Sequence, residues 1–149
     1  MQKYASLMAL ALLSATAQAD YRPIAHYTEH YSAGQKVVYE LNTQDVAVQR
    51  STLLNITNHL NTVKQADVIL LIHGDAVFSI QQGGGVPSTK DTLKKLVAQG
   101  LKIRVCDNSL KYRNLDHREL QGISEANITE AGMPALVEYQ MQGYHYVRP

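Results

Sequence analysis

The chain has 149 residues, of which 45% are hydrophobic and 18% are charged, and its formal net charge at pH 7 is +1. This composition provides enough apolar side chains for one folded core and too few charges for an intrinsically disordered protein. The near-neutral chain also lacks the basic cluster that would favour a nucleic acid or an anionic membrane surface as a partner.

The first residues have the pattern of a cleavable signal peptide. Lys3 supplies a positive charge, and residues 5–13 form an apolar run that is too short to span a bilayer, which takes about 20 residues. Ala17–Ala19 provides small residues on both sides of a glutamine before a cleavage point. We therefore expect residues 1–19 to be removed, leaving a mature chain that begins at Asp20 and works in the periplasm or outside the cell.

Residues 20–35 are rich in tyrosine, histidine and other polar side chains and show no periodicity. They predict an N-terminal arm ahead of one α/β domain over residues 36–149. His26 and His30 are four residues apart, which on a helix would place two imidazoles on one face, but no third ligand is fixed near them. We predict neither a metal site nor a cofactor.

The domain is predicted to alternate strands with helices. Residues 36–41 form a β-branched run typical of a strand, and the apolar spacing within residues 46–64 is typical of a helix. Residues 67–73 are continuously apolar, which indicates a strand covered by helices on both faces.

The same alternation continues in the second half of the domain. The remaining predicted elements are a helix from Ser88 to Gly100 opened by a capping pair of Ser88 and Asp91, a strand over 101–106, a short helix and a weak strand near Ile128, a helix from Met133 to Met141 and a strand over 144–148. Strands joined in this way predict right-handed crossovers and a three-layer αβα domain around a mostly parallel five-stranded sheet.

Five candidate site residues lie where the predicted strands end and the next elements begin. Asn42 follows the first strand, His73 and Asp75 come at the end of the second, and Cys106 and Asn108 come at the end of the third. In open parallel sheets, functional groups gather outside the carboxyl ends of the strands. We therefore expect these side chains to converge on one site.

Cys106 is the only cysteine of the chain, so no internal disulfide can form. If Asn108 or Ser109 caps a helix directly after it, the helix dipole would stabilise the thiolate, and Arg104 shares its strand face. The alternative is that Cys106 is a small buried hydrophobic residue, which is common for a free cysteine.

His73 is a candidate base or hydrogen-bond donor for the thiol, with Asp75 orienting its ring, provided that the two strands are neighbours. Alternatively, His73 only ends its strand and Asp75 is a turn residue. The sequence does not reveal which strands are adjacent, so both interpretations stay open.

Several pieces of the sequence match one known family: the opening strand with its Asn-Thr turn, residues 68–76, residues 100–106, Ala131–Gly132 and residues 140–146. In these pieces the sequence resembles the DsrE/DsrF-like family of small sulfur-relay proteins, and most closely its exported members. The resemblance implies a parallel α/β fold, assembly as a trimer or hexamer, and sulfane sulfur carried as a persulfide on a cysteine at the end of a central strand. Cys106 is the residue that matches this role.

Two functions follow as expectations. The first is an exported protein that accepts sulfane sulfur on Cys106 and relays it between thiol-containing donor and acceptor proteins, with Arg104, Asn42 and Asn108 binding the substrate. The second is a non-catalytic oligomeric binding or scaffold protein of the same fold, in which Cys106 is only buried.

Overall fold

The computed structural model describes residues 31–148. The predicted signal peptide and residues 20–30 of the predicted arm lie outside the described residues. Within residues 31–148, no helix is both long enough and apolar enough to cross a membrane.

Five strands form one sheet with the order β4-β3-β2-β1-β5, and every neighbouring pair is parallel. The strands are β1 (Lys36–Leu41), β2 (Asp67–Ile72), β3 (Lys102–Cys106), β4 (Ile128–Thr129) and β5 (His145–Val147). The predicted five-stranded sheet is therefore confirmed, and it is parallel throughout. The continuously apolar β2 lies at its centre, with all residues from Val68 to Ile72 buried.

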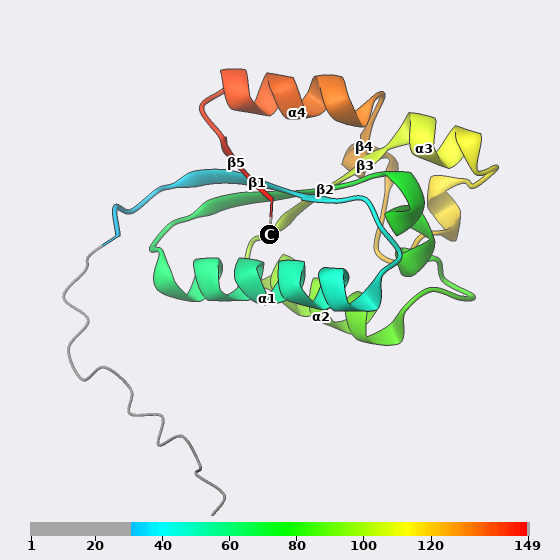
Figure 1. Cartoon of the computed structure of the whole chain (residues 1–149), viewed down its shortest axis with the longest axis horizontal. Coiled ribbons are helices and arrows are strands. Elements are labelled where there is room, and N and C mark those ends of the chain that lie inside the picture. The colour runs from blue at the N-terminus through cyan, green and yellow to red at the C-terminus, as the bar shows by residue number, and fades with distance from the viewer. Residues whose placement is uncertain (1–30, 149) are drawn as a thin grey trace, which may run out of the picture.

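Helices cover both faces of the sheet, which confirms the predicted three layers (Figure 1). Helices α1 (Val46–Thr62) and α2 (Pro87–Ala98) lie on one face, and α4 (Gly132–Met141) lies on the other. Side chains alternate along each strand, so Val37, Tyr39 and Leu41 of β1 join the larger core beneath α1 and α2. Val38 points the other way, into a smaller core with Leu136 of α4.

Local sequence signals explain the start of α1 and the end of α2. Asp45 caps α1, because its carboxylate accepts hydrogen bonds from the backbone N–H groups of Ala47 and Val48 at 2.8 and 3.3 Å. Gly100 has a φ of +104° just after α2, as expected for a residue that ends a helix in the left-handed region.

The prediction that Ser88 caps the start of α2 is wrong, because Ser88 lies inside the helix. The helix begins at Pro87, Val86 occupies the N-cap position, and no side chain caps it. Proline suits the first helical position because its fixed φ is already helical and its missing N–H would have had no partner there.

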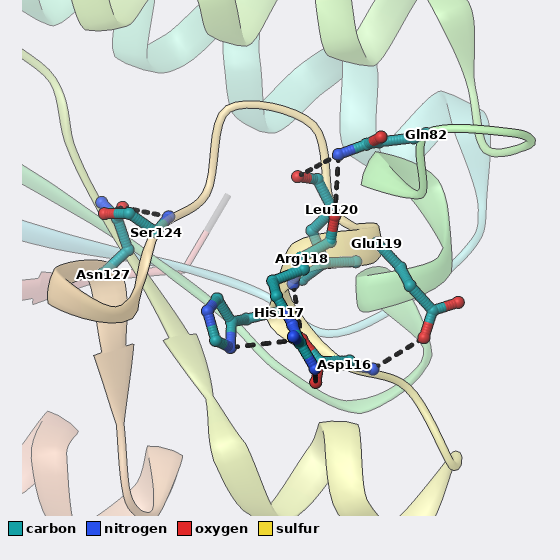
Figure 2. Close-up of polar contacts among 8 residues, drawn as sticks. All are labelled: Gln82, Asp116, His117, Arg118, Glu119, Leu120, Ser124 and Asn127. Carbon is teal, nitrogen blue, oxygen red and sulfur yellow. Dashed lines mark hydrogen bonds and ion pairs between the residues drawn. The ribbon is translucent and has the colours of Figure 1, made fainter.

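The segment between β3 and β4 contains α3 (Asp107–Tyr112) and two short 3₁₀ turns, His117–Glu119 and Glu125–Asn127. Figure 2 shows how polar side chains fix these turns. Asp116 accepts a hydrogen bond from the N–H of Arg118 at 2.8 Å, and Glu119 accepts one from the N–H of Asp116 at 2.9 Å. Backbone and side-chain bonds of this kind explain how a segment with little regular structure keeps one conformation.

Candidate functional site

The site lies at the carboxyl edge of the sheet, where β2 and β3 end next to each other. Ile72 pairs with Val105, so the next residues, His73 and Cys106, lie side by side at the ends of neighbouring strands. A Cβ atom built on Gly132 would be 3.4 Å from the Cβ atoms of both residues. The structure therefore places the two residues that the sequence analysis singled out side by side, with the start of α4 packed against both, although no hydrogen bond joins their side chains within residues 31–148.

Cys106 is buried, with 5% of its surface exposed. The backbone N–H of Gly132 donates a hydrogen bond to its Sγ atom at 3.2 Å. Gly132 is the first residue of the ten-residue helix α4, and Cys106 itself precedes the first residue of α3. The first backbone N–H of α4 thus points at the sulfur, whereas none of the N–H groups of the six-residue α3 bonds it.

Neither Asn108 nor Ser109 caps α3, contrary to the expectation from the sequence. Cys106 occupies the N-cap position of α3, and no side chain caps the helix. The hydroxyl of Ser109 instead accepts a hydrogen bond from the N–H of Gly74 at 2.9 Å, which ties α3 to the turn after His73. Asn108 has an exposed side chain, and its backbone N–H donates to the carbonyl of Glu130 at 3.2 Å.

Glu40 of β1 is the residue that contacts the imidazole of His73. Its Oε1 atom lies 2.6 Å from Nε2 of His73, and the amide of Asn42 donates to the same oxygen at 3.1 Å. The hydroxyl of Tyr146, from the edge strand β5, donates to the other oxygen, Oε2. One carboxylate thus connects three elements at the carboxyl edge of the sheet: β1, β5 and the residue after β2.

The electrostatics of this cluster favour an ionised Glu40. Burial raises the pKa of its carboxyl group, but hydrogen bonds from Tyr146, His73 and Asn42, together with the charge of His73, outweigh burial and lower it. For Tyr146, burial and then the hydrogen bond to Glu40 raise the pKa of the phenol to about 12. Glu40 is therefore a carboxylate and Tyr146 a neutral donor near neutral pH.

Asp75 does not orient His73, contrary to the expectation from the sequence. Its carboxylate pairs with the guanidinium of Arg113 at 2.6 Å from Nη2 and 3.0 Å from Nε. The physical reason is the turn at Gly74, where a φ of +57° directs the chain into a 3₁₀ turn and away from the strand. A lone carboxylate in the apolar run of residues 36–41 was the sequence signal that could have identified Glu40.

Arg104 of β3 lies on the same strand face as Cys106, two residues before it, and is half-buried. Its Nη1 atom donates to the carbonyl oxygen of Ile103 at 3.0 Å. Within residues 31–148 it forms no ion pair with a carboxylate. The guanidinium is therefore directed to the backbone of the preceding residue, and no contact with the thiol is formed within these residues. In the same part of the chain, no group of three or more histidine, cysteine or acidic side chains could hold a metal ion.

Comparison with known proteins relates the chain to one family and one fold. The sequence model of the DsrE/DsrF-like family matches residues 35–149. The protein of unknown function MTH1491 from Methanobacterium thermoautotrophicum superposes with a TM-score of 0.69 at 19% sequence identity, over 77% of this chain and 99% of that chain. The ychN protein from E. coli superposes with a TM-score of 0.60 at 18% identity, with the same coverage of both chains. No curated protein matches the sequence.

Proposed function

Because the chain belongs to the DsrE/DsrF-like family, we propose that it accepts and relays sulfane sulfur as a persulfide on Cys106. The observation that carries this proposal is the position of Sγ at the end of a central strand, where it accepts the N–H of Gly132 at 3.2 Å beside His73. A thiolate is the attacking species in sulfur exchange, and the N–H of Gly132 at the start of α4 favours it at this position.

The proposed step is an exchange between the Cys106 thiolate and a donor persulfide, and it needs no oxidant. The thiolate of Cys106 attacks the outer sulfur of a donor persulfide, R–S–SH, so that a new S–S bond forms on Cys106 and the S–S bond of the donor breaks. The donor leaves as a thiolate and takes up the proton that Cys106 lost, giving R–SH. Arg104 supports the approach of an anionic sulfur species, whereas Asn42 acts through its bond to Glu40.

The experiment is sulfur loading followed by intact-mass measurement. The reduced protein, incubated with polysulfide, should gain one or more sulfur atoms, lose them on treatment with dithiothreitol, and gain none in Cys106→Ser. Circular dichroism should show that this variant keeps the wild-type fold. If the folded, reduced wild-type protein takes up no sulfur, the carrier proposal is wrong.

A non-catalytic binding or scaffold protein is the second candidate, and the 5% exposure of Cys106 is the observation that favours it. Iodoacetamide separates the two functions, because a reactive thiol is labelled in the native protein and an inert buried thiol is labelled only after denaturation. Since Cys106 is the only cysteine, the mass of the labelled chain reports this one site.

We also propose that the protein is a homo-oligomer assembled through α4. Its outer face carries an apolar stripe of Met133, Val137 and Met141, which are 48%, 56% and 79% exposed and spaced four residues apart. Val137→Glu should shift the mass measured by light scattering towards the monomer. Leu54→Glu on α1 is the matched control, because Leu54 is also 56% exposed. A wild-type monomer at micromolar concentration would contradict the proposal.

Finally, we propose that the protein is exported and that its thiol partners are exported proteins as well. The small residues before Asp20 support this, together with the basic and apolar segments that precede them. Intact mass of the protein from the producing cells should correspond to a chain that begins at Asp20. A cytoplasmic product that retains residues 1–19 would contradict it.

A further inference from the structure

The Glu40 carboxylate is unusual because it occupies a nearly buried position on an otherwise apolar strand face. Its side chain is 9% exposed, and its nearest neighbours on that face are Val38 of its own strand and Leu71 of β2. A charge at such a position destabilises the fold unless other groups compensate for its lost hydration. Three groups do so here, and all of them lie towards the site: His73, Asn42 and Tyr146.

The bond between Glu40 and His73 determines which nitrogen of the ring is left for the thiol. Nε2 is engaged by the carboxylate, whereas Nδ1 forms no hydrogen bond within residues 31–148, either with the neighbouring Cys106 thiol or with any other group. A carboxylate on one ring nitrogen fixes the orientation of the imidazole and makes the other nitrogen a better proton acceptor. The same carboxylate also stabilises the charged ring once it has taken up a proton.

We propose that Glu40, held by Tyr146, is the positioning residue that prepares His73 to accept the proton of the Cys106 thiol. This inference rests on the proposed function, in which Cys106 attacks a sulfane sulfur. The proton moves from Sγ to Nδ1 as the thiolate forms, and it is then given to the thiolate that leaves the donor. No electron is gained or lost in this transfer. Tyr146 contributes indirectly, because its hydroxyl fixes the second oxygen of Glu40 from the edge strand β5.

The surrounding groups do not replace Glu40 in this role. The charged or polar groups that each neighbouring element brings to the cluster are Asn42 after β1, Arg104 and Cys106 from β3, Ser109 from α3, the N–H of Gly132 from α4, and Tyr146 with Arg148 at the C-terminus. Asp107 of α3, directly after Cys106, is paired with Lys111 at 2.6 Å, so the contact of His73 with a carboxylate depends on Glu40.

A second carboxylate that accepts a hydrogen bond from a tyrosine hydroxyl lies at the opposite end of the sheet and provides matched controls. Asp67, at the start of β2, accepts a hydrogen bond from the hydroxyl of Tyr144 at 2.8 Å and pairs with Lys102 at 2.8 Å. Asp67→Asn and Tyr144→Phe therefore remove a partly buried carboxylate and a tyrosine hydroxyl of the same kind, far from the thiol. They report what such a loss does to the fold alone.

The test is the pH dependence of Cys106 alkylation by iodoacetamide in the full chain, measured without any sulfur donor. Glu40→Gln should raise the pH midpoint of alkylation by about one unit, because an imidazole without its carboxylate partner is a weaker proton acceptor and takes the thiol proton less readily. Tyr146→Phe should raise the midpoint by a smaller amount. Asp67→Asn and Tyr144→Phe should leave the midpoint at its wild-type value. Glu40→Gln should also slow sulfur loading from polysulfide about tenfold at neutral pH.

The outcomes separate this inference from the proposed function. If wild-type Cys106 loads sulfur but neither Glu40→Gln nor Tyr146→Phe moves the midpoint, the positioning role is wrong and the carrier function stands. If the midpoint moves but no sulfur is loaded, the positioning role stands and the carrier function is wrong. Should Glu40→Gln not fold, Tyr146→Phe decides, because Tyr146 is 36% exposed. A native thiol that cannot be labelled at any pH overturns the positioning role.

Discussion

Replacing Gly74 by alanine should destabilise the protein more than replacing a glycine of similar backbone conformation elsewhere. Gly74 follows His73 directly and has a φ of +57°. A Cβ atom there would lie 2.9 Å from the backbone oxygen of Asn42, closer than such atoms normally approach. The substitution therefore adds strain from the left-handed conformation, about 1–2 kcal/mol, and a steric cost of about 1–3 kcal/mol.

Gly122 is the matched control, because its φ is +72° and a Cβ atom on it would meet nothing within 4 Å. Gly122→Ala should cost only the conformational strain, about 1–2 kcal/mol. Urea unfolding followed by circular dichroism gives the free energy of unfolding for both variants. We expect Gly74→Ala to lose about 1–3 kcal/mol more than Gly122→Ala.

The same substitution should also affect the site, because the turn at Gly74 determines where His73 lies. Native Cys106 should be alkylated more slowly in Gly74→Ala than in the wild type, and at the wild-type rate in Gly122→Ala. Equal free-energy losses in the two variants would refute the steric argument. An unchanged alkylation rate in Gly74→Ala would refute the link between this turn and the thiol.

Two further predictions concern stability. Gln49 is fully buried, and its side-chain amide forms hydrogen bonds with the hydroxyls of Ser79 and Thr89. Gln49→Leu should therefore lower the free energy of unfolding by about 2–4 kcal/mol. A loss below about 1 kcal/mol in urea unfolding would contradict this. Burial raises the pKa of Asp67, but the hydrogen bond from Lys102 and other contacts lower it overall. The ionised Asp67 therefore stabilises the folded protein above the pKa that the group has in the unfolded chain. This stabilisation is lost as the pH falls through the lower pKa of the folded state. Asp67→Asn should therefore flatten the decline of stability in acid, and a decline as steep as that of the wild type would argue against it.

The elements of the fold could be predicted from the sequence because their signals are local. The apolar spacing of α1 and the continuous apolar run of β2 depend only on residues near in the chain, and both elements form where they were expected. Asp45 and Gly100 act at helix ends for the same reason. The positions of His73 and Cys106 directly at predicted strand ends were likewise enough to indicate that both lie at one edge of the sheet.

The partners within the site depended on the tertiary structure. Only the strand order, with β2 between β1 and β3, makes His73 a neighbour of both Cys106 and Glu40. Tyr146 reaches the same carboxylate although 106 residues separate them in the chain. The sequence analysis instead expected Asp75 to orient His73, because the two residues are close in the chain. The turn at residue 74 directs Asp75 to Arg113. Such contacts arise from packing between distant segments, and no local pattern of polar and apolar residues encodes that packing.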